Sequence, residues 1–234
     1  MRILILVILV LLFSWLVLFK FVNRLLRRLG RVGPCPSRFS WLLDFRPSRW
    51  YRNTVLDWIG LQPGTTVVEI GPGPGTFTVP AAQRIRPGGR LVAIDIQPGM
   101  IAKLERRLQE THVENVATFL ADASDLPLKA NSVDHVFLIS ALPEIPDRGR
   151  ALAEIHRVLR PTGVLSVSED FLDPDYSFRS ETIRLVKEAG YTLIQSFGGV
   201  WLYTLNFRKL ETSSGRAHEA TTDDETDSKL VRDD

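Results

Sequence analysis

The sequence Val67-Val68-Glu69-Ile70-Gly71-Pro72-Gly73-Pro74-Gly75-Thr76 joins an apolar run to a turn rich in glycine and proline. The apolar run predicts a buried strand over 65–70, and the pattern that follows predicts a helix over 76–85. A glycine-rich turn between a strand and a helix lets a ligand approach the backbone beside the amino terminus of the helix. The turn alone therefore predicts a nucleotide-type ligand.

Three details of the turn argue against a nicotinamide dinucleotide. Its glycines follow the spacing G-x-G-x-G, whereas the dinucleotide fingerprint G-x-G-x-x-G would need glycine at Thr76. Glu69, two residues before the first glycine, has no role in binding a pyrophosphate, and Pro72 and Pro74 remove backbone N–H donors that a pyrophosphate would use. None of the four tyrosines is followed four residues later by the lysine that a short-chain oxidoreductase needs.

Two aspartates follow the next two predicted strands. Asp95 lies 20 residues after Gly75, at the distance where an acid can accept hydrogen bonds from ribose hydroxyls. Its alternative role is to cap the helix that starts near Pro98. Asp122 follows the third strand, where a carboxylate can accept a hydrogen bond from the exocyclic amine of an adenine. Its alternative interpretation is a surface loop residue.

Short apolar runs alternate with helical patterns along the middle of the chain, which is typical of an α/β protein with helices on both faces of a parallel sheet. The last two strands are separated only by Gly198-Gly199-Val200, and so short a connection requires an antiparallel hairpin. We therefore expect a seven-stranded, mostly parallel sheet that ends in this hairpin. The strands are expected at 65–70, 90–94, 116–120, 133–140, 164–168, 191–197 and 201–207. The helices are expected at 47–60, 76–85, 98–110, 148–159 and 179–189.

The amino-terminal segment is apolar from Ile3 to Phe19 except for Ser14. About 20 helical residues cross a hydrocarbon core of roughly 30 Å, so a transmembrane anchor is expected over 1–22. A cleaved signal peptide is the alternative, but this run is longer than a signal sequence needs and bulky or basic residues follow it. The basic residues directly after the run predict that the following domain faces the cytoplasm.

Charge is distributed unevenly although the net charge is only +2. Residues 23–46 form a basic juxtamembrane segment, a folded domain is expected over 47–210, and an acidic, disordered tail over 211–234. Nine basic residues and one acidic residue lie between positions 20 and 52, beside the span, which argues against a nucleic-acid partner. The lone Cys35 excludes an internal disulfide, and no pair of histidines has the spacing of a metal site, so no metal is expected.

Residues 65–170 resemble the class I methyltransferases that depend on S-adenosylmethionine (SAM), a Rossmann-like fold, and particularly the branch of the ubiquinone and menaquinone enzymes. The matching stretches are VVEIGPGPGTFT, LVAIDIQPGM, ADASDLPLKANSVDHVFL and ALAEIHRVLRPTGVLSVSE. The resemblance implies SAM as the cofactor. The residues that it implies for cofactor binding are Glu69, Gly71, Pro72, Gly73, Asp95, Ile96, Asp122, Ala123 and Ser140. Within this set, Asp95 would hold the ribose, Ile96 would pack on the adenine, and Ser140 would lie near the transferred methyl.

The acceptor half of the site departs from the quinone enzymes, because residues 140–146 lack their substrate motifs. A general base is needed only if the methyl acceptor arrives protonated. The candidates for such a base are Glu144, Asp170, Asp173, Asp175 and Tyr176, each of which has a turn or capping role as its alternative. His135, within a predicted strand, is expected to be a packed core residue.

These features together predict a membrane-anchored methyltransferase with a hydrophobic or lipid-like small-molecule acceptor, such as a quinone or an isoprenoid. Two alternatives stay open at this point. One is a non-catalytic, SAM-binding scaffold or regulator at the membrane, and the other is a methyltransferase that acts on a small thiol or a protein.

Overall fold

The structure is a computed structural model, and it describes residues 49–210 of the 234-residue chain. The predicted anchor over 1–22, the basic segment over 23–46 and the acidic tail over 211–234 lie outside the described residues. Within 49–210, no helix is long and apolar enough to cross a membrane.

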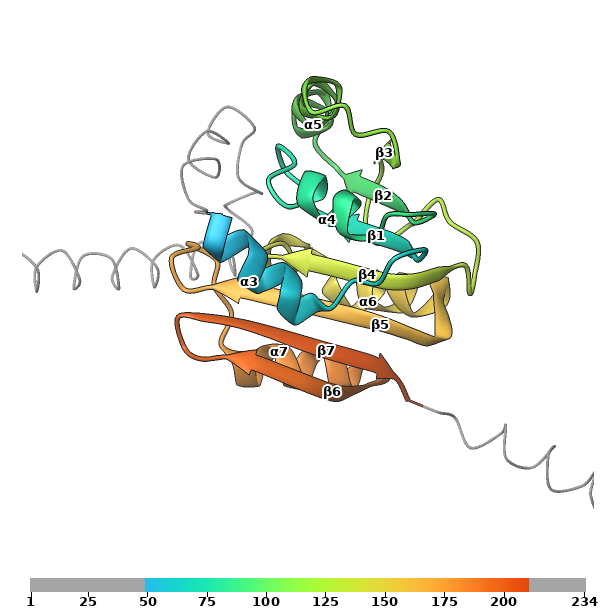
Figure 1. Cartoon of the computed structure of the whole chain (residues 1–234). Helices are drawn as coiled ribbons and strands as arrows, with labels where there is room; N and C mark the ends of the chain where they lie inside the picture. Colours follow the sequence, from blue (N-terminus) through green and yellow to red (C-terminus); the bar gives the residue numbers. More distant parts are fainter. Residues whose placement is uncertain (1–48, 211–234) are drawn as a thin grey trace, which may run out of the picture.

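The described chain folds into one seven-stranded sheet with helices on both faces (Figure 1). The order of the strands is β3-β2-β1-β4-β5-β7-β6. The strands are β1 Thr66–Ile70, β2 Arg90–Asp95, β3 Val116–Leu120, β4 Val133–Ile139, β5 Leu159–Asp170, β6 Tyr191–Gly198 and β7 Leu202–Lys209. The helices are α3 Arg49–Ile59, α4 Thr78–Arg84, α5 Pro98–Glu110, α6 Arg148–Val158 and α7 Arg179–Glu188, with a short 3-10 helix η2 at Leu142–Glu144.

Each face of the sheet has its own apolar core, as alternation along buried strands requires. On one face, α3, α4 and α5 cover a cluster that includes Val67 and Phe137. On the other face, α6 and α7 cover a cluster that includes Val68, Ile70 and Val167. The expected Rossmann-like α/β architecture is confirmed.

The carboxyl-terminal hairpin is also confirmed. Strand β7 runs antiparallel to both β5 and β6, with Ser168 opposite Thr204 and Gly198 opposite Tyr203. Gly198 has a φ of +77°, and a Cβ there would lie 2.1 Å from the carbonyl oxygen of Leu202. Only glycine fits this backbone conformation at so close an approach, so Gly198 fixes where the hairpin turns.

Most boundaries differ from the sequence expectation by one or two residues, and two of the differences have a clear structural cause. Helix α4 begins at Thr78 and not at 76, because the positive φ angles of Gly71, Gly73 and Gly75 extend the turn. Strand β5 is longer than expected, since it pairs with β4 on one side and with β7 as far as Asp170 on the other.

His135 is a buried core residue, as expected. Its Nε2 lies 2.8 Å from the Ser166 hydroxyl, which in turn donates to the Asn206 side-chain oxygen at 2.7 Å. Asn206 also donates to the Trp58 carbonyl of α3 at 2.9 Å. This polar chain ties β4, β5 and β7 to one covering helix, and burial lowers the pKa of His135 to about 4.

Candidate active site

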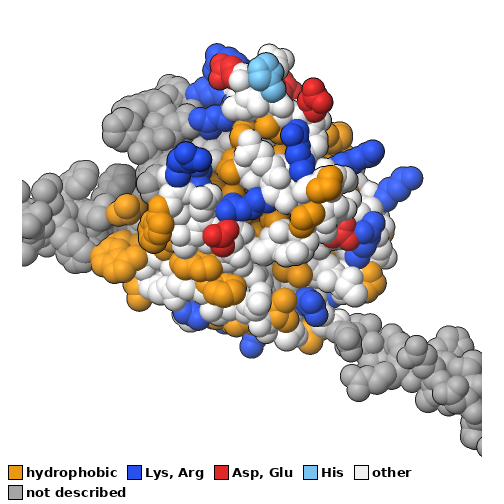
Figure 2. Space-filling view, viewed as in Figure 1, with side chains coloured by type: hydrophobic (Ala, Val, Ile, Leu, Met, Phe, Trp, Pro, Cys, Tyr) orange, Lys and Arg blue, Asp and Glu red, His pale blue; other side chains and the backbone are white. Residues whose placement is uncertain are grey.

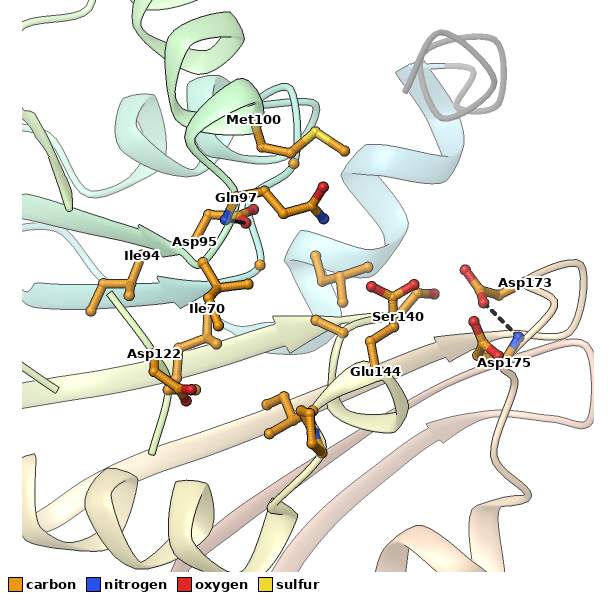
Figure 3. A pocket seen from close by; sticks show the side chains of 18 of the residues that line it. Ile70, Ile94, Asp95, Gln97, Met100, Asp122, Ser140, Glu144, Asp173 and Asp175 are labelled. Carbon is orange, nitrogen blue, oxygen red and sulfur yellow. Dashed lines mark hydrogen bonds between the residues drawn. The ribbon is translucent and has the colours of Figure 1, made fainter. Parts of the chain in front are cut away.

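A pocket of about 640 Å³ opens at the carboxyl ends of the parallel strands (Figure 3). Its walls come from the ends of β1, β2, β3 and β4 and from the segment after β5. The chain leaves β1 toward β2 on one side, while β4 continues the sheet on the other. Open α/β sheets bind their ligands at such a switch point, and the volume is that of a small-molecule site.

The glycine turn forms one wall of this pocket, and its glycines have different roles. Gly71 and Gly73 line the pocket with φ angles of +72° and +53°. A Cβ at Gly71 would lie 2.7 Å from the Cβ of Ala141, which also lines the pocket. Gly75 instead makes room for α5, because a Cβ there would lie 2.6 Å from a methyl carbon of Leu104.

Asp95 stands at the end of β2, where its side chain lines the pocket and is 8% exposed. One carboxylate oxygen accepts the backbone N–H of Gln97 at 2.9 Å, so Asp95 both orients the start of α5 and faces the pocket. Burial raises the pKa of Asp95, and the backbone N–H groups of Gln97, Gly73 and Ile96 partly offset that rise. Ile96 and Met100 continue the same wall as an apolar surface.

Asp122 and Ala123 line the pocket beyond β3, and Ser140 lines it beyond β4. One Asp122 oxygen accepts both the N–H and the hydroxyl of Ser124 at 2.8 Å. Ser140 has a φ of +51°, and its N–H donates to the Ser168 carbonyl at 2.8 Å.

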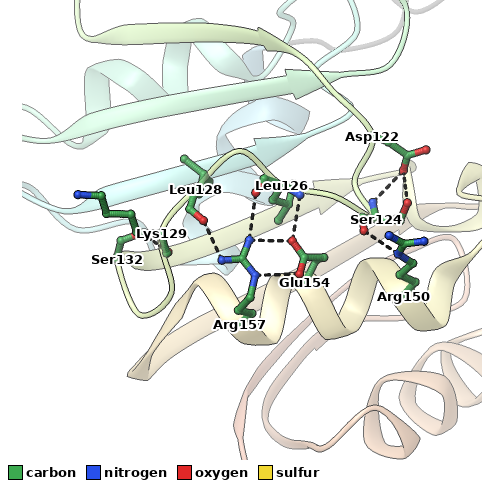
Figure 4. Close-up of polar contacts among 9 residues, drawn as sticks. All are labelled: Asp122, Ser124, Leu126, Leu128, Lys129, Ser132, Arg150, Glu154 and Arg157. Carbon is green, nitrogen blue, oxygen red and sulfur yellow. Dashed lines mark hydrogen bonds and ion pairs between the residues drawn. The ribbon is translucent and has the colours of Figure 1, made fainter.

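Helix α6 holds the loop that carries Asp122 (Figure 4). Arg150 donates to the Ser124 carbonyl at 3.1 Å, and Arg157 donates to the Leu128 carbonyl at 2.8 Å. Arg157 also pairs with Glu154 at 2.7 Å, and this hydrogen-bonded pairing lowers the pKa of Glu154. The loop is thus fixed by contacts with α6 that local sequence spacing does not indicate.

Two of the predicted cofactor residues do not line the pocket. Pro72 is buried in the turn, where its carbonyl accepts the N–H of Gly75 at 3.0 Å. Glu69 is 3% exposed beneath α4, and its Oε2 has no hydrogen-bond partner among the described residues. Burial raises the pKa of Glu69 to about 8; nearby Thr78 opposes this rise and the Asp95 charge adds to it.

The other end of the pocket is acidic, and it contains three of the five candidate bases. Glu144, Asp173 and Asp175 line it (Figure 3). The remaining two candidates, Asp170 and Tyr176, do not line the pocket. Asp170 accepts a hydrogen bond from the Tyr51 hydroxyl at 2.9 Å, and the Tyr176 hydroxyl donates to the Val200 carbonyl at 2.7 Å.

Sequence reasoning missed Glu169, which is 1% exposed at the end of β5. Its carboxylate oxygens have no close hydrogen-bond partner among the described residues, although the nearby backbone N–H of Ser177 partly offsets the effect of burial on its pKa. Burial raises its pKa well above the ordinary value, and the negative charges of Asp173, Glu144 and Asp175 add to the rise. The available indication was that this acid directly follows the predicted strand 164–168. Within 49–210, no group of histidine, cysteine, aspartate and glutamate side chains is arranged to hold a metal ion.

Residues 68–167 match the family model described as a methyltransferase domain. The matched segment resembles a class I methyltransferase domain, and SAM is the cofactor that this resemblance implies. The pocket fits this cofactor, because it joins a glycine wall that a Cβ would fill, a carboxylate beside an apolar surface, and a second carboxylate after β3.

Curated relatives share part of this sequence, and solved structures share its fold. The chain is 35% identical over 155 residues to an uncharacterized 37.1 kDa protein in transposon TN4556 of Streptomyces fradiae, covering 63% of this chain and 44% of that protein. It is 26% identical over 136 residues to a demethylmenaquinone methyltransferase of Listeria welshimeri, covering 58% of each. The chain thus spans about half the length of these relatives. A SAM-dependent methyltransferase from Aquifex aeolicus shares the fold, with a TM-score of 0.69 at 22% identity over 75% of this chain and all of that one.

Proposed function

We propose that this protein is a membrane-anchored enzyme that transfers the methyl group of SAM to a hydrophobic small molecule, with a quinone-like ring as the leading acceptor class. The observation that carries the proposal is the pocket itself. Its cofactor end has the glycine wall and Asp95, and the same cavity continues without a break to a second end with room for an acceptor. A demethylmenaquinone methyltransferase among the relatives supports the quinone-like class.

The second end combines apolar walls with carboxylates. Ile145, Pro146 and Leu172 supply apolar surface there, and Glu144 and Asp173 supply oxygen atoms. A flat, apolar ring that carries a hydroxyl group would find both kinds of contact in this place. This match is the reason to prefer such an acceptor over a nucleic acid.

The sulfonium of SAM supplies a methyl group that is already activated, so the protein has three tasks. Asp95 would accept hydrogen bonds from the ribose hydroxyls and so hold the middle of the cofactor, between its adenine and its methionine. Ile96 and Met100, which line the pocket, would pack against the adenine and exclude water there. Glu144, at the opposite end, orients the acceptor and takes its proton when the nucleophile arrives protonated.

The anchored location is the second part of the proposal. The apolar run over 3–19 and the basic residues after it support a single membrane span with the domain on the cytoplasmic side, where SAM is made. A lipophilic acceptor dissolved in the bilayer would then be close to the enzyme.

Purified full-length protein in detergent should be incubated with methyl-labelled SAM and, in parallel, with demethylmenaquinone, a bacterial membrane lipid extract and a small alkyl thiol. We expect label in a quinone or lipid product, and strongly reduced label with the Asp95→Ala variant at a SAM concentration near the wild-type dissociation constant. Label in the thiol or in protein would show that the acceptor belongs to that class and not to the quinone-like one. SAM binding without any labelled product would support the scaffold alternative and overturn the enzymatic proposal.

A further inference from the structure

Three exposed apolar side chains lie beside the acceptor end of the pocket. Leu172, Val200 and Trp201 are 55%, 64% and 62% exposed, and we call them the apolar rim. Leu172 also lines the pocket, so the rim is continuous with the cavity. In Figure 2, apolar side chains gather on the left side of the domain, where Figure 1 shows the β5–α7 and β6–β7 connections. Exposed apolar surface next to a ligand site is typical of an interaction surface.

The rim is held in place by well-defined contacts. The Phe171 N–H donates to the Trp201 carbonyl at 2.8 Å, and the two rings lie edge to face with their centroids 4.7 Å apart. The Tyr176 hydroxyl donates to the Val200 carbonyl at 2.7 Å. The turn between β6 and β7 is therefore fastened to the segment that lines the pocket, and its exposed side chains are part of the fold.

The chain enters the domain at the same edge. Helix α3 begins at Arg49, and Tyr51 in its first turn donates to Asp170 at the end of β5, one residue before Phe171. Trp50 is 73% exposed beside it. The 48 preceding residues contain the apolar run over 3–19 and seven of the nine basic residues found between positions 20 and 52. The segment proposed to span the membrane thus connects to the domain on the side of the apolar rim.

We infer that the apolar rim inserts into the interface of an anionic lipid bilayer, so that the acceptor end of the pocket opens onto lipid. The inference rests on the proposed anchor. Tryptophan is enriched at membrane interfaces, and basic residues beside a span are attracted to anionic lipid headgroups. An acceptor dissolved in the bilayer then reaches the pocket past Leu172 without crossing water.

The test places one fluorescent probe at a time on the full-length chain. The chain has five tryptophans, so intrinsic fluorescence would not isolate the rim. In a Cys35→Ser background, an environment-sensitive dye is attached at Val200→Cys or, as a matched control, at Glu114→Cys. Glu114 is exposed just before β3, at the opposite edge of the sheet. Both proteins are reconstituted into phosphatidylcholine–phosphatidylglycerol vesicles that contain spin-labelled lipid, and SAM binding verifies that each is folded.

We expect at least threefold stronger quenching by the spin-labelled lipid at position 200 than at position 114. In the Val200→Cys protein, Trp201→Asp should reduce that quenching at least twofold, whereas Leu210→Asp should leave it unchanged. Leu210 is 51% exposed but lies at the far end of β7, so it controls for the added charge.

Equal or absent quenching at the two positions, in protein that floats with the vesicles, would overturn the inference and leave the proposed anchor intact. Protein that fails to float would overturn both. A third measurement uses an aqueous quencher in the absence of vesicles. If protection of the dye at position 200 from that quencher increases with protein concentration, the apolar rim contacts a second copy of the chain, and the inference is overturned.

Discussion

At the scale of single residues, the carboxylate of Asp95 has two different tasks. One oxygen accepts the N–H of Gln97 at 2.9 Å and so belongs to the fold, while the side chain as a whole faces the pocket. The surrounding wall is apolar, and there a hydrogen bond from a ligand hydroxyl to an ionised carboxylate is worth about 1.5–3 kcal/mol. Cofactor affinity should therefore depend on this residue more than global stability does.

We predict that Asp95→Ala weakens SAM binding about 10- to 100-fold, which is the same free energy expressed as an affinity ratio. Isothermal titration calorimetry measures the dissociation constant, and far-ultraviolet circular dichroism verifies the fold. Asp57→Ala is the matched control, because Asp57 is an exposed acid on α3 that pairs with Arg84 outside the pocket. Wild-type affinity in Asp95→Ala would refute the ribose assignment.

Gly71 offers a second test at this scale, because two separate obstacles oppose a side chain there. Its φ is +72°, and a Cβ would lie 2.7 Å from the Cβ of Ala141. We expect Gly71→Ala to lower the free energy of unfolding by about 1–3 kcal/mol, with the midpoint measured by denaturant titration. Adding Ala141→Gly should restore only the part of the lost unfolding free energy that comes from the contact between the two Cβ atoms, since the backbone strain at position 71 persists. Full recovery in the double variant would show that the positive φ costs nothing.

At the scale of elements, the polar chain from His135 through Ser166 to Asn206 joins three strands and α3 inside the core. Burial lowers the pKa of His135 to about 4, whereas an unfolded histidine titrates near 6.5. Between these values the unfolded chain binds more protons than the folded one. The contribution of His135 to stability is thus complete above pH 6.5 and is lost as the pH falls toward 4.

We predict that this residue alone lowers the free energy of unfolding by about 3 kcal/mol between pH 7 and pH 4. His135→Gln keeps a side chain that can hydrogen-bond to Ser166 but does not titrate. Urea unfolding at several pH values should therefore show a shallower slope for the variant over this window. Equal slopes for variant and wild type would mean that the folded protein accommodates the charged imidazole.

The elements themselves were largely predictable from the sequence, and the reason is local. The spacing of apolar residues along the chain distinguishes strands from helices. The connection Gly198-Gly199-Val200 is too short for anything but a hairpin. The start of α4 was less predictable, because its delay to Thr78 depends on the positive φ angles of the preceding glycines. The length of β5 depends on pairing with β7, which is more than 30 residues away.

The candidate site likewise contains residues that could be predicted from the sequence and residues that could not. Gly71, Gly73, Asp95 and Asp122 follow directly from strand ends, so their order along the chain placed them at one edge of the sheet. Glu169 could not be found this way, since its burial and its proximity to the pocket acids arise from tertiary packing. The separate packing role of Gly75 against Leu104 also requires the position of α5.

At the scale of the whole molecule, the pocket connects parts of the chain that are far apart. Its walls run from Ile70 in β1 to Asp175 after β5, so they include both sides of the switch between β1 and β4. A ligand that binds these walls only in the folded state stabilises all of them together. The two apolar cores, one on each face, share the same strands and should unfold with the pocket in a single transition.

We therefore predict that SAM at 100 times its dissociation constant raises the free energy of unfolding of full-length protein in detergent by about 2.7 kcal/mol. For a domain of this size, that change corresponds to an increase of roughly 5–11 °C in the melting temperature. Differential scanning fluorimetry should show one transition that moves as a whole, with half the wild-type shift or less for Asp95→Ala at the same SAM concentration and a full shift for Asp57→Ala. Two transitions, of which only one responds to SAM, would contradict the coupling, because the glycine wall would then unfold independently of the hairpin side of the sheet.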